Sequence, residues 1–287
     1  MPTASERVYA AEGLPAAGVV NQELSETIDR LWPENLGYEK PKTADTDECP
    51  DLNEGGRPIS AQASGYVDAI DDEGLLRLAR ERDLVIRLAR RPGHFVVLGN
   101  PLALVWPIER SDDETSDLIN GMFTLTSHRT PFQDVEFAID QLVEIAVRAL
   151  SPGINDPFTA MACIDRLCEA LCQLCQRRIP SSHRYDQDKR LRIIAKPVSF
   201  ESVMDAAFNQ IRQYGRGNPA VLIRLLESLA IISNHAKRVK DLESLERHTT
   251  LVHRASAAAV PEEADRKDID ARFEAVHAAL RNARKSE

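Results

Sequence analysis

The chain has 287 residues, of which 43% are hydrophobic and 28% charged, and its formal net charge is -9. A chain of this length and composition buries a real core in one large or two ordinary domains, and it is globular rather than disordered. The diffuse acidic charge argues against a nucleic-acid partner, because a basic face supplies most of the affinity for nucleic acid. No run of ~18 apolar residues occurs, and the first residues lack the basic and apolar blocks of a signal peptide. The chain as given is therefore expected to be cytoplasmic.

The first 63 residues divide into a helical segment and a linker. Within the N-terminal segment 1–32, Leu24 and Ile28 fall on one face of a short amphipathic helix predicted over 18–32. Pro, Gly, Asp, Glu and Thr dominate residues 33–63, a composition typical of a flexible linker.

Residues 64–130 change to the alternating pattern of a small β-rich domain. The expected elements, in chain order, are a strand over 64–71, a helix over 71–82, a strand over 84–89, short strands flanking turns at 92–93 and 99–101, and a strand over 123–125. This order resembles the barrel-sandwich hybrid of lipoyl and biotinyl carriers, and also the C-terminal β-domain of pyrimidine nucleoside phosphorylases. It implies a small β-barrel-like domain. No lysine occurs between Lys42 and Lys189, which excludes biotin or lipoate attachment there, and no cofactor is expected.

Residues 131–287 carry a helical pattern and complete an α+β chain, with the β-barrel-like domain followed by an all-α bundle. The expected helices span 134–150, 157–177, 200–214, 219–237, 242–258 and 262–284. An internal repeat is also indicated, because AVRALSPGINDPFTAMACIDRL aligns with FNQIRQYGRGNPAVLIRLLESL. The simpler explanation is that two helical hairpins use the same turn chemistry.

The segment RALSPGINDPFTA, 148–160, is the most informative stretch of the chain. Ser151 precedes a proline, which ends the first helix, and Gly153 permits a positive φ. Asp156 or Asn155 is suited to the N-cap of the next helix, with Pro157 as its first residue.

A second loop repeats this logic with glycines at 215 and 217, followed by Asn218 and Pro219. If the two hairpins pack side by side, both loops share one end of the bundle. The spacing then predicts a pocket for a small anionic ligand near two helix N-termini, lined by Arg148, Asn155, Asp156, Arg216 and Asn218. The alternative is a pair of capped connectors without a binding role.

The stretch RTPFQDVEFAIDQLVEIAVRALSPGINDPFTAMACIDRL resembles the signature of a bacterial family of predicted membrane proteins of unknown function, domain of unknown function 2254. SGYVDAID and IRQYGRGNPAVLIRLLE resemble the same family, and the similarity runs from about Val19 to Arg272. One departure is Asp140, which stands where the family usually has a base. The resemblance implies importance for several positions, namely Arg129, Thr130, Gln133, Asp134, Arg148, Ser151, Pro152, Gly153, Asn155, Asp156 and Pro157.

Such proteins usually begin with several membrane helices, which this chain lacks. The resemblance therefore implies a cytosolic portion at the cytoplasmic face of the bacterial inner membrane, with membrane association through N-terminal spans that are missing here.

Other chemistries find little support in the sequence. Four cysteines at 163, 168, 172 and 175 fit buried thiols of one helix better than a metal site, since no partner pair with metal spacing is visible. Neither H-E-x-x-H, G-x-S-x-G nor G-x-G-x-x-G occurs. No metal is expected. The basic run 77–94 alternates with acidic residues and is interpreted as a solvated face, with anionic lipid as the rival partner.

The favoured function is therefore a non-catalytic ligand-sensing or interaction module of a membrane protein. One alternative is a hydrolase or transferase that uses Asp156 or Asp134 as a general base, with Arg148 stabilising an oxyanion. Another is a homo-oligomerisation module, in which the apolar helices 134–150 and 219–233 bury against a second copy.

Overall fold

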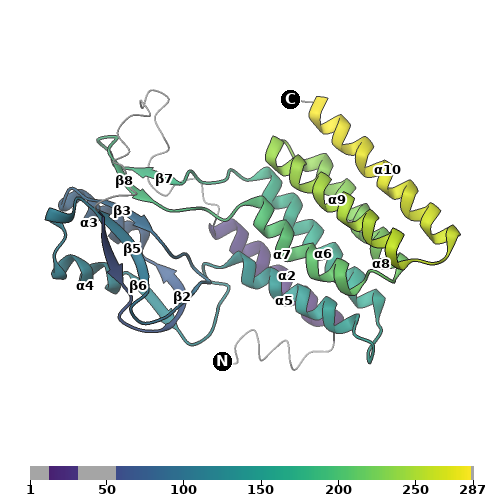
Figure 1. Cartoon of the computed structure of the whole chain (residues 1–287), viewed down its shortest axis with the longest axis horizontal. Helices are drawn as coiled ribbons and strands as arrows, with labels where there is room; N and C mark the ends of the chain where they lie inside the picture. The colour runs from purple at the N-terminus through teal and green to yellow at the C-terminus, as the bar shows by residue number, and fades with distance from the viewer. Residues whose placement is uncertain (1–12, 32–55, 286–287) are drawn as a thin grey trace. The chain divides into compact units, whose positions relative to one another are not determined.

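The computed structural model describes residues 13–31 and 56–285 (Figure 1). The chain divides into two compact units, each built from separate stretches of sequence. The helical unit contains residues 1–30, 135–178 and 198–287, and the β unit contains residues 31–134 and 179–197.

The β unit consists of two open sheets with short helices. Its strands are β1 (Arg57–Ser60), β2 (Gly65–Ile70), β3 (Val85–Leu88), β4 (Phe95–Val96), β5 (Pro101–Trp106), β6 (Phe123–Thr126), β7 (His183–Tyr185) and β8 (Leu191–Ile194), and its helices are α3 (Asp72–Glu81), η1 (Ile108–Arg110) and α4 (Asp113–Gly121). One sheet has the order β1-β5-β3-β8-β7 and the other β4-β2-β6. All neighbouring strands are antiparallel except β3 and β8, which run parallel.

The expected β-barrel is wrong for the described residues, because neither sheet closes. A barrel requires each edge strand to pair with another, whereas β1 and β7 remain the edges of the larger sheet and β4 and β6 those of the smaller. The two sheets instead share one apolar core, in which Ile59, Leu75, Ile86 and Leu102 have no exposed surface. Strands of two to six residues are stabilised mainly by this packing.

Strands β7 and β8 enter the β unit from the helical half of the sequence. Buried Arg192 on β8 donates to Asp186 (2.7 Å) and to Asp83 (2.7 Å), which lies just before β3 with φ +51°. These bonds and the β3–β8 pairing join segments about a hundred residues apart. The sequence pattern predicted neither strand, because three or four residues give no clear period.

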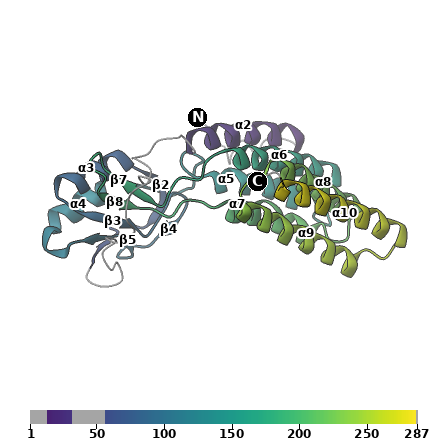
Figure 2. The same cartoon turned by 90° about the horizontal axis from the view of Figure 1, so that it is seen from above.

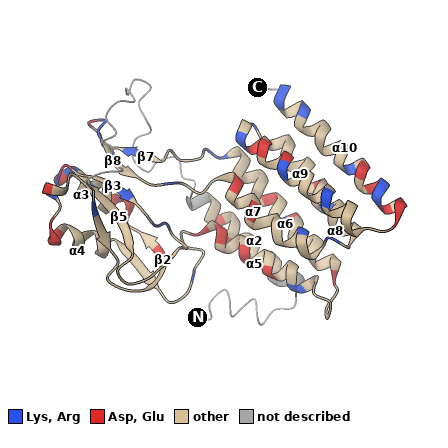
Figure 3. Cartoon of the chain, in the orientation of Figure 1, with Lys and Arg blue, Asp and Glu red and all other residues tan. Residues whose placement is uncertain are grey.

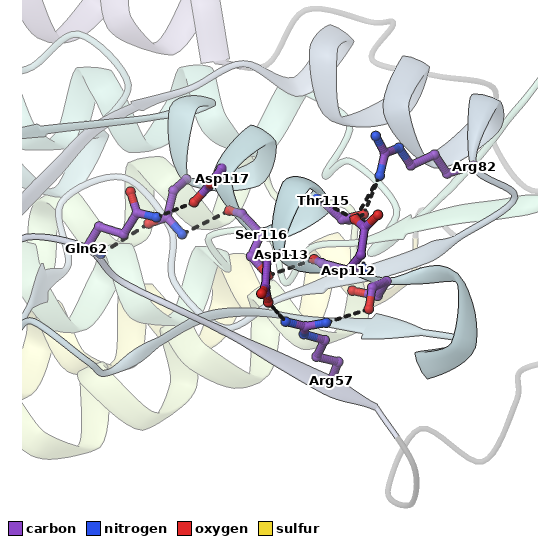
Figure 4. Close-up of polar contacts among 10 residues, drawn as sticks. Arg57, Gln62, Arg82, Asp112, Asp113, Thr115, Ser116 and Asp117 are labelled. Carbon is purple, nitrogen blue, oxygen red and sulfur yellow. Dashed lines mark hydrogen bonds and ion pairs between the residues drawn. The ribbon is translucent and has the colours of Figure 1, made fainter.

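Helix α4 was also not expected, although its start carries a capping box. Asp112 accepts from the backbone N–H of Thr115 (2.8 Å), whose hydroxyl in turn accepts from the backbone of Asp112. Figure 4 shows Arg82 and Arg57 reaching the same region, where Arg82 pairs with Asp112 (2.9 Å) and Arg57 with Asp113. The carboxylate of Asp112 is thus held by several donors, and its pKa falls to about 2, with the hydroxyl of Thr115 as the largest cause.

The helical unit contains α2 (Gly13–Leu31) and three consecutive hairpins. These are formed by α5 (Val135–Ala149) with α6 (Pro157–Gln176), α7 (Phe200–Tyr214) with α8 (Pro219–His235), and α9 (Val239–Ala259) with α10 (Glu263–Lys285). Helices α5, α7 and α9 pack in one row, and α6, α8 and α10 in a second (Figure 1). Repeated hairpins stacked in two rows are the arrangement of α-solenoids. The repeat expected for two hairpins thus extends to a third.

Helices α2, α6, α8 and α10 run in the same direction. Along α2 and α6, Asn21 bonds Glu169 (3.1 Å) and Ser25 bonds Gln173 (3.3 Å), so both numbers rise together. Asp165 and Gln176 of α6 meet Arg224 (3.3 Å) and His235 (3.2 Å) of α8 in the same sense. Figure 2 shows these helices following one another across the unit. Their N-terminal ends therefore lie at one end of the helical unit.

The helical half agrees closely with the expected elements, and α7 has the expected bounds. The β half agrees for β2, α3, β3 and β6, but β1 lies inside the segment expected to be a linker. The rest of that linker, residues 33–55, lies outside the described residues.

Candidate functional site

The two Gly-Pro loops meet at the same end of the helical unit, because α6 and α8 are parallel and each follows one of them. We call this surface, residues 150–158 and 214–219, the paired-loop end. Its position follows from the contacts along α6 and α8 described above. The expectation that both loops share one end is thereby met.

The first loop is a self-contained N-cap. The carboxylate of Asp156 accepts from the backbone N–H of Phe158 (3.1 Å) and Thr159 (3.2 Å) and from the Thr159 hydroxyl (2.5 Å). The hydroxyl of Thr159 is the largest cause that lowers the pKa of Asp156, and the backbone bonds add to it. Asn155 has φ +49°, which lets the chain turn into the cap. A carboxylate thus already occupies the start of α6.

The second loop is capped by a neutral side chain. Asn218 accepts from the backbone N–H of Val221 (3.3 Å). Arg212, in the last turn of α7, has its Nε buried without a hydrogen-bond acceptor. Burial lowers the pKa of its guanidinium because the charged form loses water. Arg216 is exposed in the loop itself. This loop therefore combines two arginines with a helix start that no acidic side chain caps.

Large apolar side chains are exposed at the paired-loop end. Phe158 is 75% exposed, Tyr214 58% and Ile154 56%. They come from different hairpins, so only the packing of the hairpins brings them to one end. Sequence periodicity missed them because each lies at a loop or in the first or last turn of a helix, where the helical period has no meaning.

The residues expected to line a pocket reach this end in part. Arg148 lies in the last turn of α5 and pairs with Glu144 (2.6 Å), one turn earlier. The backbone C=O of Ser151 accepts from Asn155 (2.9 Å), and a Cβ at Gly153 would meet open space. The side-chain contacts seen for Asp156 and Asn218 stay within their own hairpins.

Arg129 belongs to the β unit, not to the helical unit. It pairs with buried Asp134 (2.8 Å), which approaches so closely that a Cβ at Gly93 would lie 2.2 Å from its oxygen. Gln133 binds the backbone of Ile70 in both directions, at 3.0 and 3.4 Å. The RTPFQD segment thus fastens the chain before α5 to β2.

A buried polar cluster between α7 and α9 was not foreseen. His248 has no exposed surface, and its Nε2 lies 3.0 Å from the carboxylate of Asp205, which Arg247 also binds (2.8 Å). Burial is the main cause that lowers the pKa of His248 to about 4, helped by Arg247 and opposed by Asp205. Nothing local marks these residues, because they meet only when α9 packs on α7.

The four described cysteines lie on α6, three of them buried and Cys172 half-buried. Desolvation raises the pKa of Cys163 and of Cys175 to about 12, so both stay protonated thiols. In the described part of the chain, no group of three or more His, Cys, Asp or Glu side chains is arranged to hold a metal ion. A search of the same residues for a helix with the length and apolar character to cross a bilayer finds none.

Comparison with known proteins gives the family. Residues 16–231 match the family described as "Predicted membrane protein (DUF2254)". The chain belongs to this family. It is 28% identical over 244 residues to "Uncharacterized protein Rv1290c" of Mycobacterium tuberculosis and to "Uncharacterized protein Mb1321c" of Mycobacterium bovis.

Each match covers 83% of this chain but 46% of the relative, so the chain spans less than half the length of these proteins. No solved structure matches significantly. The family has no known activity, and the function is argued from the chain itself.

Proposed function

We propose that this chain is a non-catalytic interaction module of a bacterial membrane protein, on the cytoplasmic side of the inner membrane. Its binding surface is the paired-loop end, and its ligand carries a small anionic group. The observation that carries the proposal is the parallel packing of α6 and α8, which gathers both loops and the exposed side chains of Phe158 and Tyr214 at one end.

The second loop is the better place for an anion. Arg212 has a buried Nε–H without an acceptor, and an anion would supply one while offsetting the desolvation of the guanidinium. Arg216 adds a second cation, and Asn218 leaves the start of α8 uncharged. By contrast, an anion at the first loop would compete with the carboxylate of Asp156.

The catalytic alternative has weaker support. A general base needs a free lone pair, whereas Asp156 accepts three hydrogen bonds that lower its pKa. Asp134 is buried against Arg129 in the other unit, and Arg148 pairs with Glu144. Assembly through α5 and α8 also loses its motive, because Leu142, Leu225 and the other apolar residues on their inner faces are already buried within the chain.

A thermal-shift screen with inorganic phosphate, nucleotides and carboxylates tests the proposal. We expect at least one anion to raise the melting temperature, since a ligand that binds only the folded state stabilises it. Arg216→Gln should abolish this shift, and the exposed Lys267→Gln on α10 should leave it unchanged. If no anion stabilises the chain at millimolar concentration, or if both variants respond alike, the proposed site is wrong.

A further inference from the structure

We propose that the paired-loop end docks on an anionic lipid bilayer, with its exposed apolar side chains entering the headgroup region and its arginines pairing with lipid phosphates. This inference rests on the proposed function, because it names the lipid headgroup as the source of the anionic ligand. It commits the surface to a membrane, not to a soluble partner.

The apolar part of the surface is the first support. Phe158, Tyr214 and Ile154 expose between 56% and 75% of their surface, although each is large enough to be buried in a core. Single exposed apolar residues are ordinary, but several at one end of a unit mark an interaction surface. An aromatic ring is suited to the boundary between water and lipid, where one side of the ring is wet and the other is dry.

The charge around these side chains is the second support. Residues 145–164 contain one acidic side chain, Asp156, and residues 206–226 contain none. Arg148, Arg212 and Arg216 lie in the same stretches, within a chain whose net charge is -9. Asp156 spends its charge on its own helix N-terminus. The surface is therefore locally basic, as an anionic membrane requires.

Acidic residues at the start of α10 set the limit of the surface. Glu263 and Asp265 lie in the first turn of α10, which Figure 3 shows in red. Arg272 of α10 lies 3.8 Å from Glu227 of α8, so α10 adjoins α8 on the side away from α6. Two helix spacings, about 18 Å, separate α10 from α6. This exceeds the ~8 Å Debye length at physiological ionic strength, so the docking surface centres on α6 and its loop.

Helix α2 and the family point the same way. The bonds from Asn21 to Glu169 and from Ser25 to Gln173 make α2 parallel to α6, so the chain enters α2 at the end where Phe158 is exposed. The family is described as a predicted membrane protein. A surface at this end brings the start of α2 and the exposed side chains to the bilayer together.

Vesicle co-sedimentation with the whole chain tests the proposal. Vesicles of phosphatidylglycerol and phosphatidylcholine in equal parts should bind the protein, and vesicles of phosphatidylcholine alone should bind it weakly. Phe158→Ser should lower the partition coefficient at least about fivefold, given the free energy of burying an aromatic ring. Leu98→Ser removes an equally exposed apolar side chain, 63% exposed, from the β unit and should change nothing.

The soluble-anion screen separates this inference from the proposed function. Arg216→Gln should weaken both the anion shift and vesicle binding, whereas Phe158→Ser should weaken vesicle binding alone. A phosphate-induced shift without vesicle binding would leave the proposed function standing and overturn the membrane inference. Equal losses in Phe158→Ser and Leu98→Ser would also overturn it, because binding would then not depend on the paired-loop end.

Discussion

The buried histidine between α7 and α9 makes the stability of this chain depend on pH. His248 has no exposed surface, and its pKa falls from 6.5 to about 4 in the folded chain, mainly because burial disfavours the imidazolium. Below pH 6.5 the unfolded chain therefore takes up a proton that the folded chain does not. The free energy of unfolding falls as the pH is lowered through this range, and the loss is complete once the pH reaches about 4.

The size of the loss follows from the shift. One pKa unit corresponds to ~1.4 kcal/mol, so a change from 6.5 to about 4 corresponds to about 3 kcal/mol for this one side chain. Arg247 and Arg212 oppose protonation of His248, and Asp205 favours it, so the shift already contains their effects. A loss of this size is a large fraction of the stability of an ordinary domain.

Urea unfolding followed by circular dichroism, repeated at several pH values, measures this effect. His248→Gln keeps an amide N–H for Asp205 but has no proton to gain, so its stability should fall less between pH 6.5 and about 4. Burial raises the pKa of Asp72 and of Asp241, and both groups act equally in the two proteins. The difference between the two curves therefore isolates the histidine. Parallel curves would refute a neutral, buried His248.

Three further substitutions test the packing of each unit. Gly93→Ala should destabilise the chain more than Gly99→Ala, because both have φ near +85° but only the first places a Cβ against a buried carboxylate, a difference measured by thermal unfolding. Arg192→Met should cost about 3–5 kcal/mol in urea unfolding, since it leaves a buried carboxylate unpaired, whereas Arg190→Met, 67% exposed, should cost little. Gln141→Met should raise the melting temperature, because both amide atoms are buried without partners and their desolvation costs about 1–3 kcal/mol each; a lower melting temperature would show that these atoms are satisfied.

The sequence determined the helical hairpins largely by itself. Asp156 before Pro157 and Asn218 before Pro219 set the starts of α6 and α8, because an N-cap and a proline act on the backbone within one turn. The apolar period then defined each helix, and the repeat of Gly, Asn and Pro indicated that two hairpins share a design. The family also followed from these stretches.

The tertiary structure decided what depends on distant partners. Strand β8 exists because Arg192 and its neighbours find β3 and Asp83 more than a hundred residues earlier, and without that pairing four residues have no reason to be extended. The same holds for the buried state of His248 and for the meeting of Phe158 with Tyr214 at one end. Short-range hydrogen bonds and periodicity are written in neighbouring residues, whereas burial and charge environment arise only when whole helices and strands pack.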